Sequence, residues 1–206
     1  MNFDLADTLT KLLEENQLDA AIEIAESELQ KIPQTGFHKI IGKRLTNQSE
    51  KLQEYIIKFD ESTTKILNKK KSFLASLLNN KTIRPSAYYC EMKGFTINYD
   101  RWFIDLFSFD KIDESDWEWL CEFYDSTTSN LTITGFEEIQ KVYEDVHENN
   151  RFAVPNIKES YEVCELIVIL RLQELFRETY KNQTAQWSQI PMFVTAHDYE
   201  MIYKVN

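Results

Sequence analysis

Apolar residues in the first part of the chain recur with the period of an α-helix, which predicts a largely helical N-terminal part. Four segments have this spacing: residues 5–13, 18–29, 37–59 and 66–78. Pro33 and Gly36 end the second of these helices, because neither residue continues a helix well. We therefore expect a helical region over residues 1–84.

The pattern then changes to short runs of aromatic and β-branched residues, which are typical of strands. Residues 88–92 and 95–99 flank a turn at Gly94 and predict a β-hairpin. Residues 102–109 are apolar on both alternating faces, which predicts a third strand that is covered on both sides. Residues 116–124 fit either a strand or a helix.

Two helices and two short strands complete the predicted elements. Thr134 and Glu137 have the spacing of a capping box, in which the two side chains close the first turn of a helix. Pro155 begins a long helix that ends near Tyr180, and its wide apolar face marks it as the central core helix. Closing strands are expected at residues 192–195 and 201–205.

Together these elements predict an α+β fold, with a mainly helical N-terminal part followed by a small antiparallel sheet with packed helices. Residues 85–206 form the α+β region of this scheme. They are either distinct from residues 1–84 or integrated with them into one domain.

The first two predicted helices resemble a single tetratricopeptide-repeat unit over residues 4–33. Ala21, Ile22, Leu29 and Pro33 stand where that family places its small, apolar and terminating residues. The resemblance implies a helical hairpin, and no second repeat follows at the expected distance. Because one repeat cannot bury its own apolar face, we expect this hairpin to pack on the rest of the chain.

The formal charge of −11 is concentrated in the second region, since residues 1–86 carry a net +1 and residues 87–206 a net −12. Such acidity repels nucleic-acid phosphates, so we expect no nucleic-acid partner. It attracts a basic protein, or serves solubility alone. No apolar stretch reaches ~18 residues and no signal-peptide core is present, so we expect a cytoplasmic protein that does not enter a membrane.

Acidic and aromatic residues are densest between Asp100 and Asp125. This stretch contains nine acidic residues and only two basic residues, Arg101 and Lys111. Three of the four tryptophans fall within 18 residues of the chain there. Aromatic side chains are frequent interface hot spots, and carboxylates around them steer a basic partner. The predicted partner-binding surface consists of Asp110, Asp113, Glu114, Asp116, Trp117, Glu118, Trp119, Glu122 and Asp125. The alternative is that the rings belong to the core and the acidic residues to its solvated opposite face.

The sequence contains no hydrolase, nucleotide-binding or metalloprotease motif, and we expect no metal and no cofactor. His197, which adjoins Asp198 between two predicted strands, is the most suggestive titratable residue. Neighbouring residues on a strand face opposite ways, which argues against direct cooperation of this pair.

In length, acidity and lack of catalytic motifs the chain is similar in type to the immunity proteins of bacterial polymorphic toxin systems. That resemblance implies a non-catalytic acidic binding protein that neutralises a basic toxin by covering its active face. Two alternatives stay open. One is a helical-repeat-like adaptor or chaperone module, and the other is an enzyme with an unrecognised site around His197 and Asp198.

Overall fold

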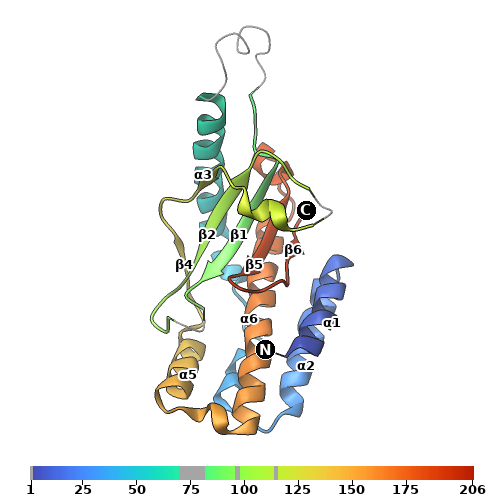
Figure 1. The fold of residues 1–206 in the computed structure, drawn as a ribbon, viewed down its shortest axis with the longest axis vertical. Coiled ribbons are helices and arrows are strands. Elements are labelled where there is room, and N and C mark those ends of the chain that lie inside the picture. The colour runs from blue at the N-terminus through green and yellow to red at the C-terminus, as the bar shows by residue number, and fades with distance from the viewer. Residues whose placement is uncertain (1, 70–81, 96–97, 114–115) are drawn as a thin grey trace.

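The structure is a computed structural model that describes residues 2–69, 82–95, 98–113 and 116–206. Its α-helices are α1 (Phe3–Glu14), α2 (Leu18–Lys31), α3 (Ser49–Lys69), α5 (Glu137–Glu148) and α6 (Pro155–Tyr180). Its strands are β1 (Ala87–Lys93), β2 (Trp102–Phe109), β3 (Asp125–Ser126), β4 (Leu131–Ile133), β5 (Met192–Ala196) and β6 (Tyr203–Lys204). Most helices run along the long axis of the molecule, and the sheet lies in front of α6 (Figure 1).

The strands form one sheet in the order β3-β2-β1-β5-β6, with β4 also paired to β2. β1 is antiparallel to β2, with Ala87 opposite Phe109, and parallel to β5, with Tyr88 opposite Met192. The α+β class is therefore confirmed, but the sheet is mixed and not wholly antiparallel as predicted. The parallel pair is possible because α6 lies between β2 and β5 in the chain and returns it to the end of the sheet at which β1 begins.

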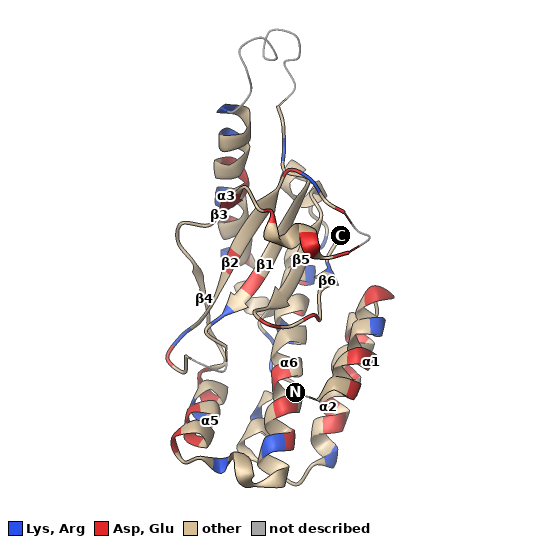
Figure 2. Ribbon diagram, viewed as in Figure 1, with Lys and Arg blue, Asp and Glu red and all other residues tan. Residues whose placement is uncertain are grey.

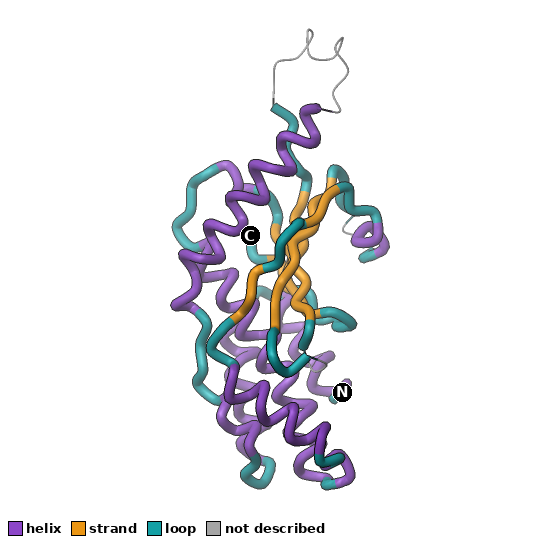
Figure 3. Tube along the Cα trace, turned by 90° about the vertical axis from the view of Figure 1, so that its left-hand side faces the viewer, coloured by secondary structure: helices purple, strands orange, loops and turns teal. Residues whose placement is uncertain are grey.

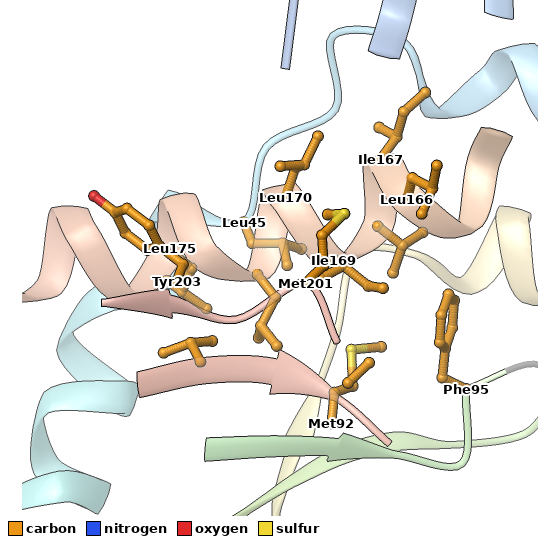
Figure 4. Packing of buried hydrophobic residues seen from close by; sticks show 14 of the residues in the cluster. Leu45, Met92, Phe95, Leu166, Ile167, Ile169, Leu170, Leu175, Met201 and Tyr203 are labelled. Carbon is orange, nitrogen blue, oxygen red and sulfur yellow. The ribbon is translucent and has the colours of Figure 1, made fainter. Parts of the chain in front are cut away.

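The predicted central core helix is confirmed as α6, whose residues 163–176 are all buried. A helix that is buried on every side needs cover on every side, and α2, α3 and β5 all pack on it. Figure 4 shows Ile169 of α6 close to Met201 and Met92, between the helix and the sheet. One hydrophobic cluster includes residues of both regions, from Leu5 to Tyr203.

The helical hairpin expected over residues 4–33 consists of α1 and α2, which pack against each other. The apolar face of α2, with Ala25 and Leu29 fully buried, packs on α6. Residues 4–33 thus form a helical hairpin that packs on the body of the protein.

The single helix predicted over residues 37–59 is wrong, because α3 begins at Ser49. The chain before it forms 3-10 turns and leaves the helical conformation at Gly42, where φ is +72°. Of the further helix predicted at residues 66–78, α3 contains the part up to Lys69 and residues 70–78 lie outside the described residues.

The hairpin predicted from residues 95–99 is also wrong, since β1 pairs with the strand confirmed as β2. The chain turns at Gly94, where φ is +77° and a Cβ atom would lie 2.7 Å from the carbonyl oxygen of Arg101. The Phe95 ring points into the core, with its centroid 5.2 Å from that of Trp102. None of the described residues of this run, Phe95, Asn98 and Tyr99, lies in a strand, and residues 96 and 97 lie outside the description.

The predicted capping box at Thr134 is not formed. The Thr134 backbone N–H and hydroxyl both donate to the Gln48 side chain, at 3.1 and 3.0 Å. The Glu137 carboxylate instead accepts from the Gly135 N–H at 2.9 Å, and α5 begins at Glu137. A long-range amide partner has therefore replaced the local cap that the sequence favours.

The closing strands are confirmed as β5 and the short β6, and residues 116–124 contain a 3-10 helix at Glu118–Cys121. Figure 3 shows the long helices on one side of the sheet and this 3-10 helix on the other. We call the second side the outer face of the sheet, and residues 110–113 together with 116–124 the covering segment. The candidate site lies on this side.

Candidate docking surface

The outer face is built by the alternation of side chains along the strands. On β1, Tyr88 and Cys90 are fully buried toward the helices, whereas Tyr89, Glu91 and Lys93 lie on the outer face and are partly buried. β2 has the same alternation. This face is therefore part apolar and part charged, and the covering segment packs on its apolar part.

Trp119 attaches the covering segment to the sheet. Its side chain is 8% exposed and packs in a small cluster with Ala87, Phe109 and Phe193. Its ring centroid lies 4.6 Å from that of Phe109 and 5.4 Å from that of Phe193. The sequence predicted that Trp119 belongs to the partner-binding surface. In the structure its ring packs inside this protein and is almost fully buried.

Trp117 has the opposite environment, since 48% of it is exposed. Its ring touches the edge of the same cluster, with a centroid 5.7 Å from that of Phe193. Phe123, further along the covering segment, is 46% exposed and packs on Phe107. The covering segment therefore presents two large rings to solvent from a base that Trp119 fixes.

The predicted acidic residues divide into three groups. Four are exposed and form no ion pair with any cationic side chain in the described part of the chain: Asp110, Asp116, Glu118 and Glu122. Asp113 is exposed but has an interaction partner, and Asp125 is partly buried in β3, where it pairs with Ser108. Glu114 lies outside the described residues. Figure 2 shows the acidic residues on this segment and along α1.

A chain of ion pairs crosses the part of the outer face that the covering segment leaves open. Lys93 Nζ lies 3.3 Å from Glu91 Oε2 and 3.4 Å from Asp105 Oδ2. His197 Nδ1 lies 2.8 Å from Glu91 Oε1. The hydrogen bond to the Glu91 carboxylate raises the pKa of His197 above its ordinary value, because it favours the protonated ring.

The expectation that the His197 and Asp198 side chains point in opposite directions assumed that both residues lie in a strand. The strand ends before this pair, and Asp198 has a left-handed backbone with a φ of +65°. The His197 Nε2 atom is 3.6 Å from Asp198 Oδ1. The imidazole thus has a carboxylate near each nitrogen, and this arrangement stabilises an exposed imidazolium that links β1 to the turn after β5.

A groove of about 650 Å³ lies beside Trp117, between α1, the outer face of β1 and residues 198–202. The sequence did not predict this groove, because its walls come from segments that are far apart in the chain. Its exposed apolar side chains are Phe3 at the start of α1, which is 70% exposed, and Trp117.

The described residues lack both an arrangement for a metal ion and a membrane-spanning helix. Across residues 2–69, 82–95, 98–113 and 116–206, no group of three or more His, Cys, Asp or Glu side chains is arranged to hold a metal ion. None of the described helices is long and apolar enough to span a bilayer.

Two of the three cysteines are buried and the third, Cys121, is exposed. Burial raises the pKa of the Cys164 thiol to about 12 and that of Cys90 well above its ordinary value. Both buried thiols therefore stay protonated and serve as small apolar groups.

No protein-family model matches this chain, and neither a curated protein nor a solved structure matches it.

Proposed function

We propose that this protein is a non-catalytic acidic binding protein whose covering segment docks a basic protein. The observation that carries the proposal is the exposed Trp117 ring, which stands among exposed carboxylates that form no ion pair in the described structure. Trp119 packs on Phe109 and Phe193 and attaches to the sheet the segment that carries this ring. An exposed aromatic ring next to carboxylates is typical of a hot spot with its steering field, and Lys204 is the one described cationic side chain that lines the pocket between Trp117 and Phe193.

Acidic steering and aromatic anchoring act at different stages of binding. Carboxylates such as Glu118 and Glu122 attract a cationic protein over about one Debye length and raise the association rate. Burial of Trp117 then slows dissociation, because a large apolar ring leaves water. The two effects together favour a tight complex with a basic partner.

The more specific form of the proposal is an immunity-type protein of the cytoplasm, which covers the active face of a basic toxin. Such a role needs charge complementarity and a firm anchor and requires no catalytic group of its own. The adaptor alternative needs a free apolar groove on the N-terminal helices. The packing of Ala25 and Leu29 between α2 and α6 removes that face from solvent, which favours binding through the sheet side.

The test uses charge reversal with a matched control. Glu118→Lys/Glu122→Lys changes the covering segment, and Glu23→Lys/Glu61→Lys makes the same change of net charge at exposed sites on α2 and α3. Affinity is measured against a panel of basic toxin domains, beginning with any basic protein that a neighbouring gene encodes.

We expect the Glu118→Lys/Glu122→Lys variant to bind its partner at least about tenfold more weakly than the control variant, since close interfacial charge pairs are strongly coupled. Equal losses in both variants would mean that only net charge matters. A full panel without binding at low salt would reject the proposal.

A further inference from the structure

The groove beside Trp117 has walls from four parts of the chain. Phe3 comes from α1, Tyr89 from β1, Trp117 from the covering segment, and Tyr199 and Ile202 from the turn after β5. Its volume of about 650 Å³ is that of a site for a few side chains or a small molecule. Two of its walls, Phe3 and Trp117, are large apolar side chains that stay substantially exposed.

The charged residues of this groove are all of one sign. Asp7, Asp198 and Glu200 line it, and none of the lining side chains is Lys, Arg or His. Asp7 and Glu200 form no ion pair with any described cationic side chain, so their charge is available to a ligand. The Asp198 side chain is 83% exposed and lies 3.6 Å from His197 Nε2, so a ligand cation at Asp198 shares this carboxylate with the imidazole.

The cavity on the opposite part of the molecule is a useful contrast. It lies between Gly36–Ile40 and α5, has a volume of about 700 Å³, and is lined by Lys39, Lys141 and Arg151 together with two acidic residues. One-signed charge is therefore a property of the groove beside Trp117 and does not follow from the acidity of the chain alone.

Charge complementarity selects the occupant. A second copy of this chain brings a formal charge of −11 to three carboxylates, and an anionic membrane or a nucleic acid is repelled in the same way. Aromatic walls next to carboxylates instead suit an aliphatic side chain followed by a lysine or arginine, whose cation contacts both ring faces and carboxylates.

We infer that the groove receives an amphipathic cationic segment of the basic partner, with an apolar side chain against Phe3 and Trp117 and a Lys or Arg at Asp198 and Glu200. This inference rests on the proposed function, which it deepens by naming the part of the partner that is recognised. It extends the docking surface beyond the covering segment to α1 and the turn after β5.

The test uses the full chain and a fluorescein-labelled amphipathic peptide of leucine and lysine, with a second peptide in which glutamate replaces every lysine. The groove variant is Asp198→Asn/Glu200→Gln, in which asparagine tolerates the left-handed backbone at position 198. The first control, Glu118→Gln/Glu122→Gln, lies on the covering segment, and the second, Glu23→Gln/Glu61→Gln, is remote.

We expect the lysine peptide to bind and the groove variant to weaken its binding about fivefold, as expected for the loss of two exposed charge pairs. The remote control should bind the peptide as the unchanged protein does. In protein labelled with 5-fluorotryptophan, the fluorine resonance of Trp117 should shift on binding, whereas that of the fully buried Trp102 should not.

Three results would overturn the inference: no binding of the lysine peptide, equal binding of the glutamate peptide, or an unchanged affinity in the groove variant. If the Glu118→Gln/Glu122→Gln control alone loses affinity, the groove inference fails while the proposed function stands. If the charge-reversal test on basic toxin domains fails as well, both fall.

Discussion

At the scale of single residues, burial separates charged side chains with a structural role from those available to a partner. Asp60 is 7% exposed and accepts hydrogen bonds from Arg84 at 2.9 and 3.0 Å and from the Tyr88 hydroxyl at 2.7 Å. Its neighbour Glu61 is exposed, as is Glu118 on the covering segment. Asp60 thus links the start of β1 to α3 through its hydrogen bonds, whereas the exposed Glu61 and Glu118 form no such buried contacts.

This distinction predicts the effect of Asp60→Asn on stability. The change removes a buried charge and leaves Arg84 and Tyr88 without their carboxylate, so the free energy of unfolding should fall by about 2 kcal/mol. Urea denaturation followed by circular dichroism measures it. Glu61→Gln is the control and should stay within about 0.5 kcal/mol of the unchanged protein. Equal stability of the two variants would contradict the assigned role of Asp60.

The ion pair of His197 with Glu91 predicts a dependence on pH. Because the folded state has the higher pKa, the pair stabilises the fold fully below the unfolded pKa of His, and that contribution disappears as the pH rises through the folded value. Glu91→Gln should therefore destabilise the protein more at acidic than at alkaline pH.

NMR titration of the imidazole measures the same effect directly, since the pKa of His197 should fall in Glu91→Gln. His147, which lies away from this pair and whose pKa burial lowers, is the internal control and should titrate unchanged. An unaltered His197 titration would show that Glu91 does not hold the proton.

At the scale of elements, the covering segment owes its position to one buried ring. Trp119 fills the space between β2 and β5 on the outer face, and Trp117 leans on the edge of that cluster. The two tryptophans are two positions apart, yet one belongs to the core and the other to the surface. Stability and binding should therefore separate at these positions.

Alanine substitution of each ring tests this separation. Trp119→Ala should lower the free energy of unfolding by about 2–3 kcal/mol, since it opens a cavity in a small apolar cluster. Hydrogen exchange should also become faster in the covering segment. Trp117→Ala should change stability by less than about 1 kcal/mol and still weaken the binding of a basic partner. A large loss of stability in Trp117→Ala, together with a loss of binding but not of stability in Trp119→Ala, would contradict these assignments.

Local sequence patterns predicted the elements whose interactions are local. The helices α1, α2 and α6 and the strand β2 all appear where the sequence predicted them, because the spacing of apolar residues along one element is a local property. The outer face of β2 is only partly buried, although the sequence predicted cover on both sides. Long-range partners decided the features that were predicted wrongly. The parallel pairing of β1 with β5 depends on distant strands, and Gln48 takes the hydrogen bonds of Thr134 from across the fold.

The candidate site follows the same rule. The sequence shows a segment rich in acidic and aromatic residues, since composition is a local property, and its role as a partner-binding surface stays a prediction. It could not assign Trp117 to solvent and Trp119 to the cluster, because their environments come from Phe109 and Phe193 on other strands. The sequence did not predict the groove, because α1, β1 and the turn after β5 come together only in the folded chain.

At the scale of the whole molecule, the long helices lie on one side of the sheet and the 3-10 helix of the covering segment on the other (Figure 3). The groove lies where the two sides meet, since residues of α1 and β1 both line it. Residues 87–206 carry a net charge of −12, and their acidic residues are shared between α5 and α6 and the outer side of the sheet. We propose that the acidic residues of the outer side dock a basic protein.

The association rate with a basic partner, measured by stopped flow at increasing ionic strength, tests that claim most directly. The account predicts a rate that falls about tenfold or more between low and physiological salt, with a much flatter dependence in Glu118→Lys/Glu122→Lys than in Glu23→Lys/Glu61→Lys. A rate that does not change with salt, or that both variants alter equally, would contradict the claim.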